Sequence, residues 1–250
     1  MTDNNTPPKP ARNASVVVVG AGDYIGGAIA KRFAAEGYLV FMGRRNADKL
    51  LPLKAEIEAA GGRAEARALD AREEDQVAAF INEAETAAPL EVVVFNIGAN
   101  VNFPLLETTS RVFRKVWELA CFAGFLTGRE GARVMLPRGR GSIFFTGATA
   151  GLRGGSGYAA FASAKFGIRA VAQATARELG PKGIHVAHLV IDAGVDTEWV
   201  RERMRAAGVS PEDRVLLQPA SVAETYWALH QQTSDAWTFE TEIRPSVEIW

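Results

Sequence analysis

The hydrophobic pattern of the chain is clearest near the N-terminus, where two apolar runs flank a glycine-rich turn and a helix. Residues 16–19 are consecutive valines, a β-branched run that favours a buried strand. A helical pattern follows the glycines, with Ile29 and Phe33 on one face, and Gly37 ends it. Residues 39–42 form the second apolar run. The segment therefore predicts a strand, a glycine turn, a helix and a second strand.

The same alternation continues to the end of the chain, without an internal repeat or a break in composition. Alternating strands and helices favour a parallel sheet covered by helices. We therefore predict a single α/β domain over residues 14–250, a Rossmann fold whose doubly wound parallel sheet has about seven strands, with helices on both faces. Further strands are expected at residues 63–69, 91–96, 142–146, 185–191 and 237–243, and further helices at residues 46–62, 73–87, 110–136, 158–179, 198–207 and 222–231.

Composition and charge narrow the class of protein. The chain has 250 residues, of which 48% are hydrophobic, so one large domain can bury a substantial core. Its net charge of −1 gives no indication of a nucleic-acid or membrane partner. A single cysteine, Cys121, excludes an intrachain disulfide and fits a reducing compartment. The polar, proline-rich residues 1–13 are expected to be a flexible tail and not a signal peptide, so we expect a cytoplasmic protein.

Candidate chemistry begins at the glycine turn, residues 20–26, which read GAGDYIG. Glycines let a pyrophosphate approach the backbone, and the following helix offers unpaired N–H groups and the positive end of its dipole. A strand before the turn and a helix after it are the context that a dinucleotide site requires. Arg44 and Arg45 stand at the end of the second strand, where an NAD site usually presents a carboxylate to the ribose. Two guanidinium groups pair well with a phosphate, which predicts NADP(H).

Other motifs follow the later strands: Asp70-Ala71, Asn96-Ile97-Gly98, and Lys165 followed by Phe-Gly. With the glycine turn, in which Tyr24 replaces the usual middle glycine, they resemble the short-chain dehydrogenase/reductase family over residues 15–245. The resemblance implies a substrate lid around residues 196–217, and a homodimer or homotetramer in which residues 110–136 and 158–179 pair between subunits. The cofactor contacts that it implies, together with the two arginines, are Gly20, Gly22, Tyr24, Ile25, Gly26, Arg44, Arg45, Asp70, Ala71, Asn96, Gly98, Lys165, Val195 and Thr197.

The proton-transfer half of that family pattern is missing. The usual catalytic set is Asn, Ser, Tyr and Lys, and only Lys165 matches it. The tyrosine position, four residues before Lys165, holds Phe161, which has no hydroxyl to donate. The serine position falls on Ala148 and the asparagine position on Cys121. The ordinary carbonyl reductase mechanism therefore cannot run unchanged.

Three hypotheses remain open. In the first, Tyr158 is the proton donor: it lies seven residues before Lys165, a spacing that resembles the enoyl reductase branch of the superfamily and puts both side chains on one helix face. Hydride would then pass to a small apolar carbonyl, activated alkene or imine. In the second, Thr146, Thr149 or Asp192 supplies the acid or base. In the third, the chain binds NADP(H) without redox turnover, as a regulatory or scaffold subunit.

We expect a small-molecule substrate and no catalytic metal. Alternation along the strand at residues 185–191 puts His185 and His188 on opposite faces, and no Cys or carboxylate cluster completes a metal site. Trp199, within the expected lid, would suit the apolar wall of a substrate pocket.

Overall fold

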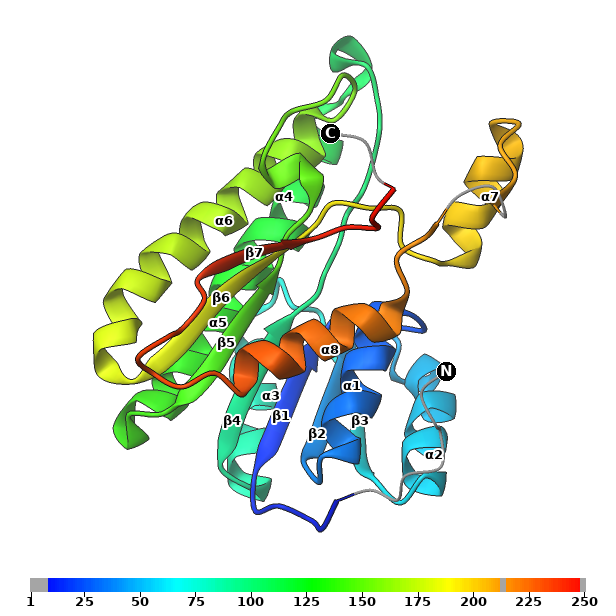
Figure 1. The fold of residues 1–250 in the computed structure, drawn as a ribbon. Helices are drawn as coiled ribbons and strands as arrows, with labels where there is room; N and C mark the ends of the chain where they lie inside the picture. Colours follow the sequence, from blue (N-terminus) through cyan, green and yellow to red (C-terminus); the bar gives the residue numbers. More distant parts are fainter. Residues whose placement is uncertain (1–8, 212–214, 248–250) are drawn as a thin grey trace.

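The computed structural model describes residues 9–211 and 215–247, whose strands form one parallel sheet with helices on both faces (Figure 1). The strands are Ser15–Val19 (β1), Leu39–Arg44 (β2), Arg63–Ala68 (β3), Leu90–Phe95 (β4), Gly141–Thr146 (β5), Ile184–Ile191 (β6) and Glu240–Ile243 (β7). Their order in the sheet is β3-β2-β1-β4-β5-β6-β7. The predicted doubly wound Rossmann sheet is therefore confirmed.

Two apolar cores lie on the two faces of the sheet, and the side chains of β1 divide between them. Val16 and Val18 belong to one core, and Val17 and Val19 belong to the other, as the alternation of a strand requires. The first core is covered by Ile25–Ala35 (α1), Leu51–Ala59 (α2) and Pro219–His230 (α8). The second is covered by Glu74–Ala87 (α3), Ala123–Met135 (α5) and Ala159–Leu179 (α6).

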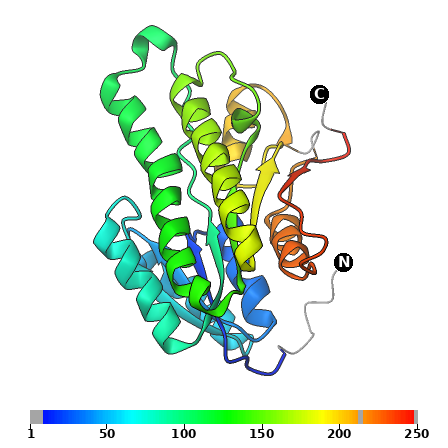
Figure 2. The same cartoon turned by 90° about the vertical axis from the view of Figure 1, so that its left-hand side faces the viewer.

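Two further helices lie outside these layers. Ser110–Trp117 (α4) packs beside α6, as the view in Figure 2 also shows. Glu198–Ala206 (α7) stands beyond the carboxyl end of the sheet, and none of its residues is buried (Figure 1). Because the strand order reverses between β1 and β4, the carboxyl ends of these strands are where an open sheet of this type binds its ligand.

Two predicted helices differ in detail. The helix expected at residues 110–136 contains a π-helical segment, Glu118–Phe122, between α4 and α5. A π-helical turn inserts one residue without breaking the helix, so a hydrophobic period cannot reveal it. The helix expected at residues 46–62 starts as a 3₁₀ turn, Ala47–Leu50, and α2 begins next to Pro52, which fits the first helical turn because it has no N–H to pair.

The segment expected to be a flexible tail, residues 1–13, lies partly outside the described residues. Its described part is fastened to the turn between α1 and β2. The Lys9 N–H donates to the carbonyl oxygen of Ala35 at 2.9 Å, and the Arg12 N–H donates to that of Gly37 at 2.8 Å. The Arg12 guanidinium also lies 4.9 Å from the centre of the Tyr38 ring. Residues 9–13 are therefore part of the folded unit, which differs from the expectation.

Candidate functional site

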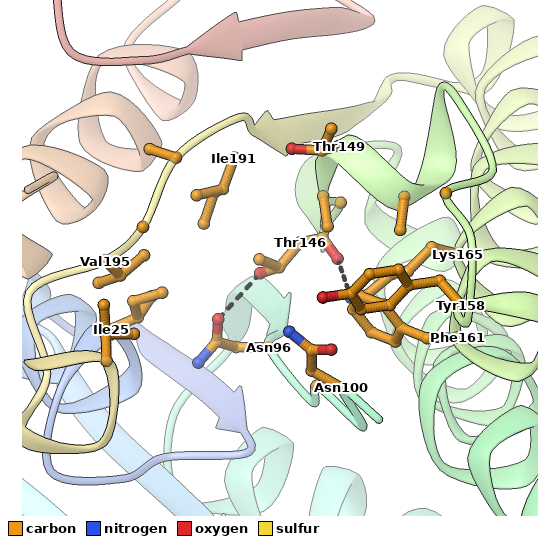
Figure 3. A pocket seen from close by; sticks show the side chains of 18 of the residues that line it. Ile25, Asn96, Asn100, Thr146, Thr149, Tyr158, Phe161, Lys165, Ile191 and Val195 are labelled. Carbon is orange, nitrogen blue, oxygen red and sulfur yellow. Dashed lines mark hydrogen bonds between the residues drawn. The ribbon is translucent and has the colours of Figure 1, made fainter. Parts of the chain in front are cut away.

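A cavity of about 650 Å³ opens at the carboxyl ends of β4, β5 and β6 (Figure 3). The start of α6 and the N-terminal part of α7 complete its wall. Most of the lining side chains are apolar, as is usual for a small-molecule site. The predicted site residues that line it are Ile25, Asn96, Gly98, Thr146, Thr149, Tyr158, Lys165, Val195 and Thr197.

The other predicted cofactor contacts lie next to this cavity, around the adjoining ends of β1, β2 and β3. They are Gly20, Gly22, Tyr24, Gly26, Arg44, Arg45, Asp70 and Ala71. An elongated ligand can therefore run from the end of β3 across the glycine turn into the cavity, which is the course that a dinucleotide follows on such a sheet.

The glycine turn holds β1 and α1 very close together. Gly20 has a φ of +86°, which L side chains rarely adopt. A Cβ on Gly26 would lie 2.6 Å from the carbonyl oxygen of Gly20, so only glycine lets α1 start there. A Cβ on Gly22 would meet no atom within 4 Å, so this part of the turn is open. An open glycine backbone beside a helix N-terminus fits a pyrophosphate.

Positive charge gathers at the ends of β2 and β3. Arg44 is the last residue of β2, and its guanidinium lies 3.4 Å from a carboxylate oxygen of Asp23. Arg45, which follows it, is exposed. The Arg72 guanidinium donates to both carboxylate oxygens of Asp70, at 2.9 and 2.5 Å, and so lowers the pKa of Asp70. The negative charge of Asp70 is thus compensated by Arg72, and Arg44 and Arg45 stand beside it as a pair of guanidinium groups that fits a phosphate group.

Lys165 is buried at the base of the cavity, where its side chain links α6 to β4 and β5. Its Nζ donates to the carbonyl oxygen of Thr146 at 2.8 Å and lies 3.5 Å from the carbonyl oxygen of Ile97. Desolvation lowers its pKa from 10.5 to about 8. The position of this ammonium group suits a donor to ligand hydroxyls at the cavity wall.

The three positions that the resemblance matched to the family's polar catalytic groups lie in one apolar cluster. Cys121 of the π-helical segment and Phe161 of α6 are buried members, and Ala148 packs against them. Burial raises the pKa of the Cys121 thiol, which disfavours a nucleophilic thiolate. Phe161 and Ala148 line the cavity. The cavity wall is therefore apolar at the places where the family resemblance would have put proton donors.

Tyr158 is the N-cap residue of α6 and is half-buried. Its ring packs against the apolar cluster that contains Phe161. Figure 3 shows its hydroxyl turned into the cavity, where the Asn100 side chain also points. Tyr158 and Lys165 thus share one cavity, as their spacing predicts for residues on one helix face.

Asp192, a predicted alternative acid, does not belong to the cavity lining. Its carboxylate accepts a hydrogen bond from the Thr149 hydroxyl, and the Arg153 guanidinium lies 3.4 Å from the same oxygen. Its other oxygen lies 3.6 Å from the Arg244 guanidinium. These contacts tie the loop after β5 to the residue that follows β7, which favours a structural role for Asp192.

Thr146 lines the cavity at the end of β5, but its hydroxyl is engaged on both sides. It donates to Oδ1 of Asn96 at 3.1 Å, as Figure 3 shows, and lies 2.7 Å from the Tyr226 hydroxyl. Since Thr146 donates its one proton to Asn96, Tyr226 is the donor in the second bond. Burial raises the pKa of Tyr226 well above its usual value. This chain of hydrogen bonds positions Asn96 and does not offer the cavity a proton donor.

Three polar residues at or beside the cavity were not predicted from the sequence. Asn100 and Arg153 line the cavity from the loops after β4 and β5, and polar residues in such loops are the signal that could have indicated them. Tyr226 comes from α8, and no local pattern connects it with Thr146. Trp199 of α7 does line the cavity, as its apolar character suggested.

Among the residues that the structure describes, no group of three or more His, Cys, Asp or Glu side chains is arranged to hold a metal ion. His185 stacks on Trp237, and His188 bonds Glu240 at 2.9 Å. No helix within residues 9–211 and 215–247 has the length and apolar character needed to span a bilayer.

Comparisons with known proteins place this fold and cavity in one family of enzymes. A family model described as short chain dehydrogenase matches residues 14–207. A crystal structure of a short-chain dehydrogenase from Rhodopseudomonas palustris is 65% identical, covers 94% of this chain and 99% of its own, and superposes with a TM-score of 0.82. The 3-oxoacyl-(acyl-carrier-protein) reductase MabA of Mycobacterium tuberculosis is 31% identical over 89% of this chain and 86% of its own length. A polyketide ketoreductase variant crystallised with NADPH is 25% identical, covers 93% of this chain and 97% of its own, and has a TM-score of 0.85.

Proposed function

Because this chain belongs to the short-chain dehydrogenase/reductase family, we propose that it is an NADP(H)-dependent oxidoreductase with a relocated proton donor, Tyr158. Its substrate is a small apolar carbonyl compound, activated alkene or imine. The observation that carries the proposal is the cavity shared by Tyr158 and Lys165, beside a glycine turn with an open face.

The cofactor-binding half of the proposal assigns one part of NADP(H) to each group of residues. The glycine turn and the N-terminus of α1 bind the pyrophosphate. Arg44 and Arg45 bind the 2′-phosphate. Lys165 donates to the nicotinamide ribose, and Val195 and Thr197 bind the carboxamide. The NADPH that cocrystallised with the related ketoreductase supports this choice of cofactor.

In the proposed reaction, the Tyr158 hydroxyl is the proton donor. When bound, NADPH supplies a hydride at its nicotinamide ring. Tyr158 donates a hydrogen bond, and then its proton, to the substrate oxygen or the enolate that develops there. Asn100 orients the substrate oxygen, and Phe161, Ala148 and Trp199 provide an apolar wall for the rest of the substrate.

The test is NADPH consumption by the full chain with a panel of enones, ketones and imines, after NADPH binding has been measured by fluorescence. We expect oxidation of NADPH with at least one class. Tyr158→Phe should lower turnover by about a hundredfold while leaving NADPH affinity unchanged. Tyr38→Phe is the matched control, because the Tyr38 hydroxyl bonds His230 away from the cavity. Unchanged turnover in Tyr158→Phe would remove the assigned donor.

The apolar cluster around Phe161 supports a second candidate, a protein that binds NADP(H) without turning it over. Cys121, Ala148 and Phe161 together remove the proton donors of the family pattern while Lys165 and the glycine turn remain. Tight NADPH binding with no consumption across the whole panel, imines included, would favour this candidate over the oxidoreductase. A protonated imine is the sharpest member of the panel, because it needs no proton from the protein.

We also propose that the chain forms a homodimer or homotetramer through α4 and α5. Phe113, Trp117 and Phe125 on these helices are each about 40% exposed, which is a large apolar surface for a monomer to leave in water. Light scattering at micromolar concentration measures the assembly, and a monomer there would contradict the proposal.

A further inference from the structure

We propose that Tyr24 is a latch that fastens the N-terminus of α7 across the cofactor site, so that NADP(H) enters and leaves only when the hydrogen bond from Glu198 to Tyr24 breaks. The inference rests on the proposed NADP(H) site, but it concerns a bond that the proposed chemistry does not use. It assigns to the tyrosine of the glycine turn a task other than contact with the pyrophosphate.

The bond joins two distant parts of the chain. The Tyr24 hydroxyl accepts a hydrogen bond from the backbone N–H of Glu198 at 3.1 Å, across 174 residues of sequence. Tyr24 is the last residue before α1, and Glu198 is the first residue of α7. The tyrosine ring therefore spans the distance from the glycine turn to the lid.

The latch joins two segments that line the cavity. Ile25, next to Tyr24, is a lining residue, and so are Thr197 and Trp199, the neighbours of Glu198. Figure 3 shows Ile25 and Val195 next to each other at one side of the cavity. The Tyr24–Glu198 bond therefore connects the glycine turn with the lid beside the cavity, on the course that a ligand lying along the turn would follow.

The other described bonds of this part of α7 stay within the lid segment. Arg201 donates to both carboxylate oxygens of Asp196, at 2.6 and 2.9 Å, and Arg205 pairs with Glu198 at 2.9 Å. No residue of α7 is buried. The segment before α7 is anchored to the residues before α8, where the Asp196 N–H donates to the carbonyl oxygen of Leu217 and the Gln218 amide donates to the Asp196 carboxylate, each at 2.9 Å. The bond to Tyr24 therefore acts beyond that anchor, on the exposed first turn of α7.

The bond also satisfies a group that helix geometry leaves unpaired. The first N–H groups of a helix have no partner within the helix. In α7, the Thr197 hydroxyl accepts from the Val200 N–H at 3.1 Å, and Tyr24 accepts from the Glu198 N–H. When the latch opens, the Glu198 N–H can bond water in place of Tyr24. Opening therefore leaves no buried group unpaired, and the latch can close again.

A latch has a kinetic signature that a direct contact lacks. Both entry and exit of the cofactor need the open lid, so a weaker latch accelerates association and dissociation together and leaves affinity nearly unchanged. A contact between Tyr24 and the cofactor would slow dissociation alone. One hydrogen bond of this kind corresponds to a change of about three- to tenfold in each rate.

The experiment removes each half of the bond separately. Tyr24→Phe removes the acceptor and keeps the ring. Glu198→Pro removes the donor N–H at the first position of α7, where proline is favoured, and Thr197, with φ −137° and ψ 150°, has the extended backbone that a residue before proline requires. Glu198→Ala is the matched control, because it keeps the backbone N–H and loses only the carboxylate that pairs with Arg205.

Stopped-flow fluorescence of NADPH gives both rate constants. We expect Tyr24→Phe and Glu198→Pro each to raise association and dissociation about three- to tenfold, the double variant to add nothing further, and Glu198→Ala to behave as the natural chain. Unchanged rates, or faster dissociation with unchanged association, would overturn the latch.

Hydrogen exchange on the same variants tests the latch without NADPH. Amides of residues 198–201 should exchange about three- to tenfold faster in Tyr24→Phe than in the natural chain, and equal exchange would overturn the latch. If the chain does not bind NADPH but its amides show this difference in exchange rate, the result contradicts the proposed function and still supports the bond between Tyr24 and Glu198 as a latch.

Discussion

The Nζ atom of Lys165 lies 5.9 Å from the centre of the Phe161 ring, so the cationic end of the buried lysine faces an aromatic surface. In the family pattern that position on α6 carries the hydroxyl that transfers the proton. The lysine is thus retained together with its hydrogen bonds to Thr146 and Ile97, while its usual partner is replaced by a side chain without a proton to give.

This relationship predicts that activity toward simple ketones can be restored. Phe161→Tyr combined with Ala148→Ser should raise kcat/KM for ketone reduction by about tenfold or more, because it returns a hydroxyl to the lysine side of the cavity and a second hydroxyl beside it. Steady-state NADPH oxidation measures the gain. Phe166→Tyr on the same helix is the control, since Phe166 is exposed and outside the cavity. No gain in the double variant would mean that another feature of the cavity excludes ketones.

The lowered pKa of Lys165 predicts a pH dependence of stability. Its folded pKa of about 8 lies below the usual 10.5, so between these values the unfolded chain holds more protons than the folded one. The free energy of unfolding should therefore rise with pH from 8 to 10.5, by on the order of 1 kcal/mol per pH unit, relative to a chain without this group. Urea unfolding of the natural chain and Lys165→Met at pH 7 to 10 gives the difference. Parallel curves for the two proteins would refute the prediction.

The pair at the end of β2 predicts cofactor preference. Arg44→Ala with Arg45→Ala should weaken NADPH binding by about tenfold to a hundredfold and leave NADH binding nearly unchanged, because charge-assisted bonds to a phosphate are lost. Titrations at fixed salt measure both affinities. Arg177→Ala is the matched control, since Arg177 is on α6 and bonds only a carbonyl oxygen of its own helix in the described hydrogen bonds. A natural chain that binds NADH as tightly as NADPH would rule out this assignment.

Close packing beneath the cavity predicts a steric limit at Gly147. A Cβ there would lie 2.5 Å from Nε2 of the buried His188 and 3.0 Å from the carbonyl oxygen of Leu189. Gly147→Ala should therefore lower the free energy of unfolding by about 1 to 3 kcal/mol. Gly154→Ala, in the same cavity wall but with no atom within 4 Å of its added Cβ, should change it little. Equal unfolding midpoints in urea for the two variants would count against this packing.

Local pattern was enough for the fold and for the class of cofactor. The valine run of β1, the glycines that follow it and the alternation of strands with helices each depend on neighbours in sequence, so they could be recognised directly. The predicted bounds of the helices were less accurate where the helix geometry changes locally, as at the π-helical segment Glu118–Phe122. Tyr158 and Lys165, whose spacing predicted a shared helix face, both line the cavity.

The roles of the polar candidates depended on partners far along the chain. Sequence offered Thr146 and Asp192 as alternatives to Tyr158, the favoured proton donor. The hydroxyl of Thr146 is held between Asn96 and Tyr226, and the carboxylate of Asp192 lies among Thr149, Arg153 and Arg244. Of these partners only Thr149 and Arg153 lie in the loop that follows Thr146, and the others are the residue after β4, a residue of α8 and the residue after β7.

By itself, then, the sequence determined a doubly wound sheet and a glycine turn suited to a dinucleotide, and it predicted that the family's usual proton donor is absent at Phe161. The tertiary structure alone decided which hydroxyl faces the cavity, that Cys121, Ala148 and Phe161 form one apolar cluster, and that Tyr24 reaches Glu198. The physical reason is that strand and helix periods record each residue's immediate neighbours, whereas hydrogen-bond partners and packing clusters arise only when folding brings distant segments together.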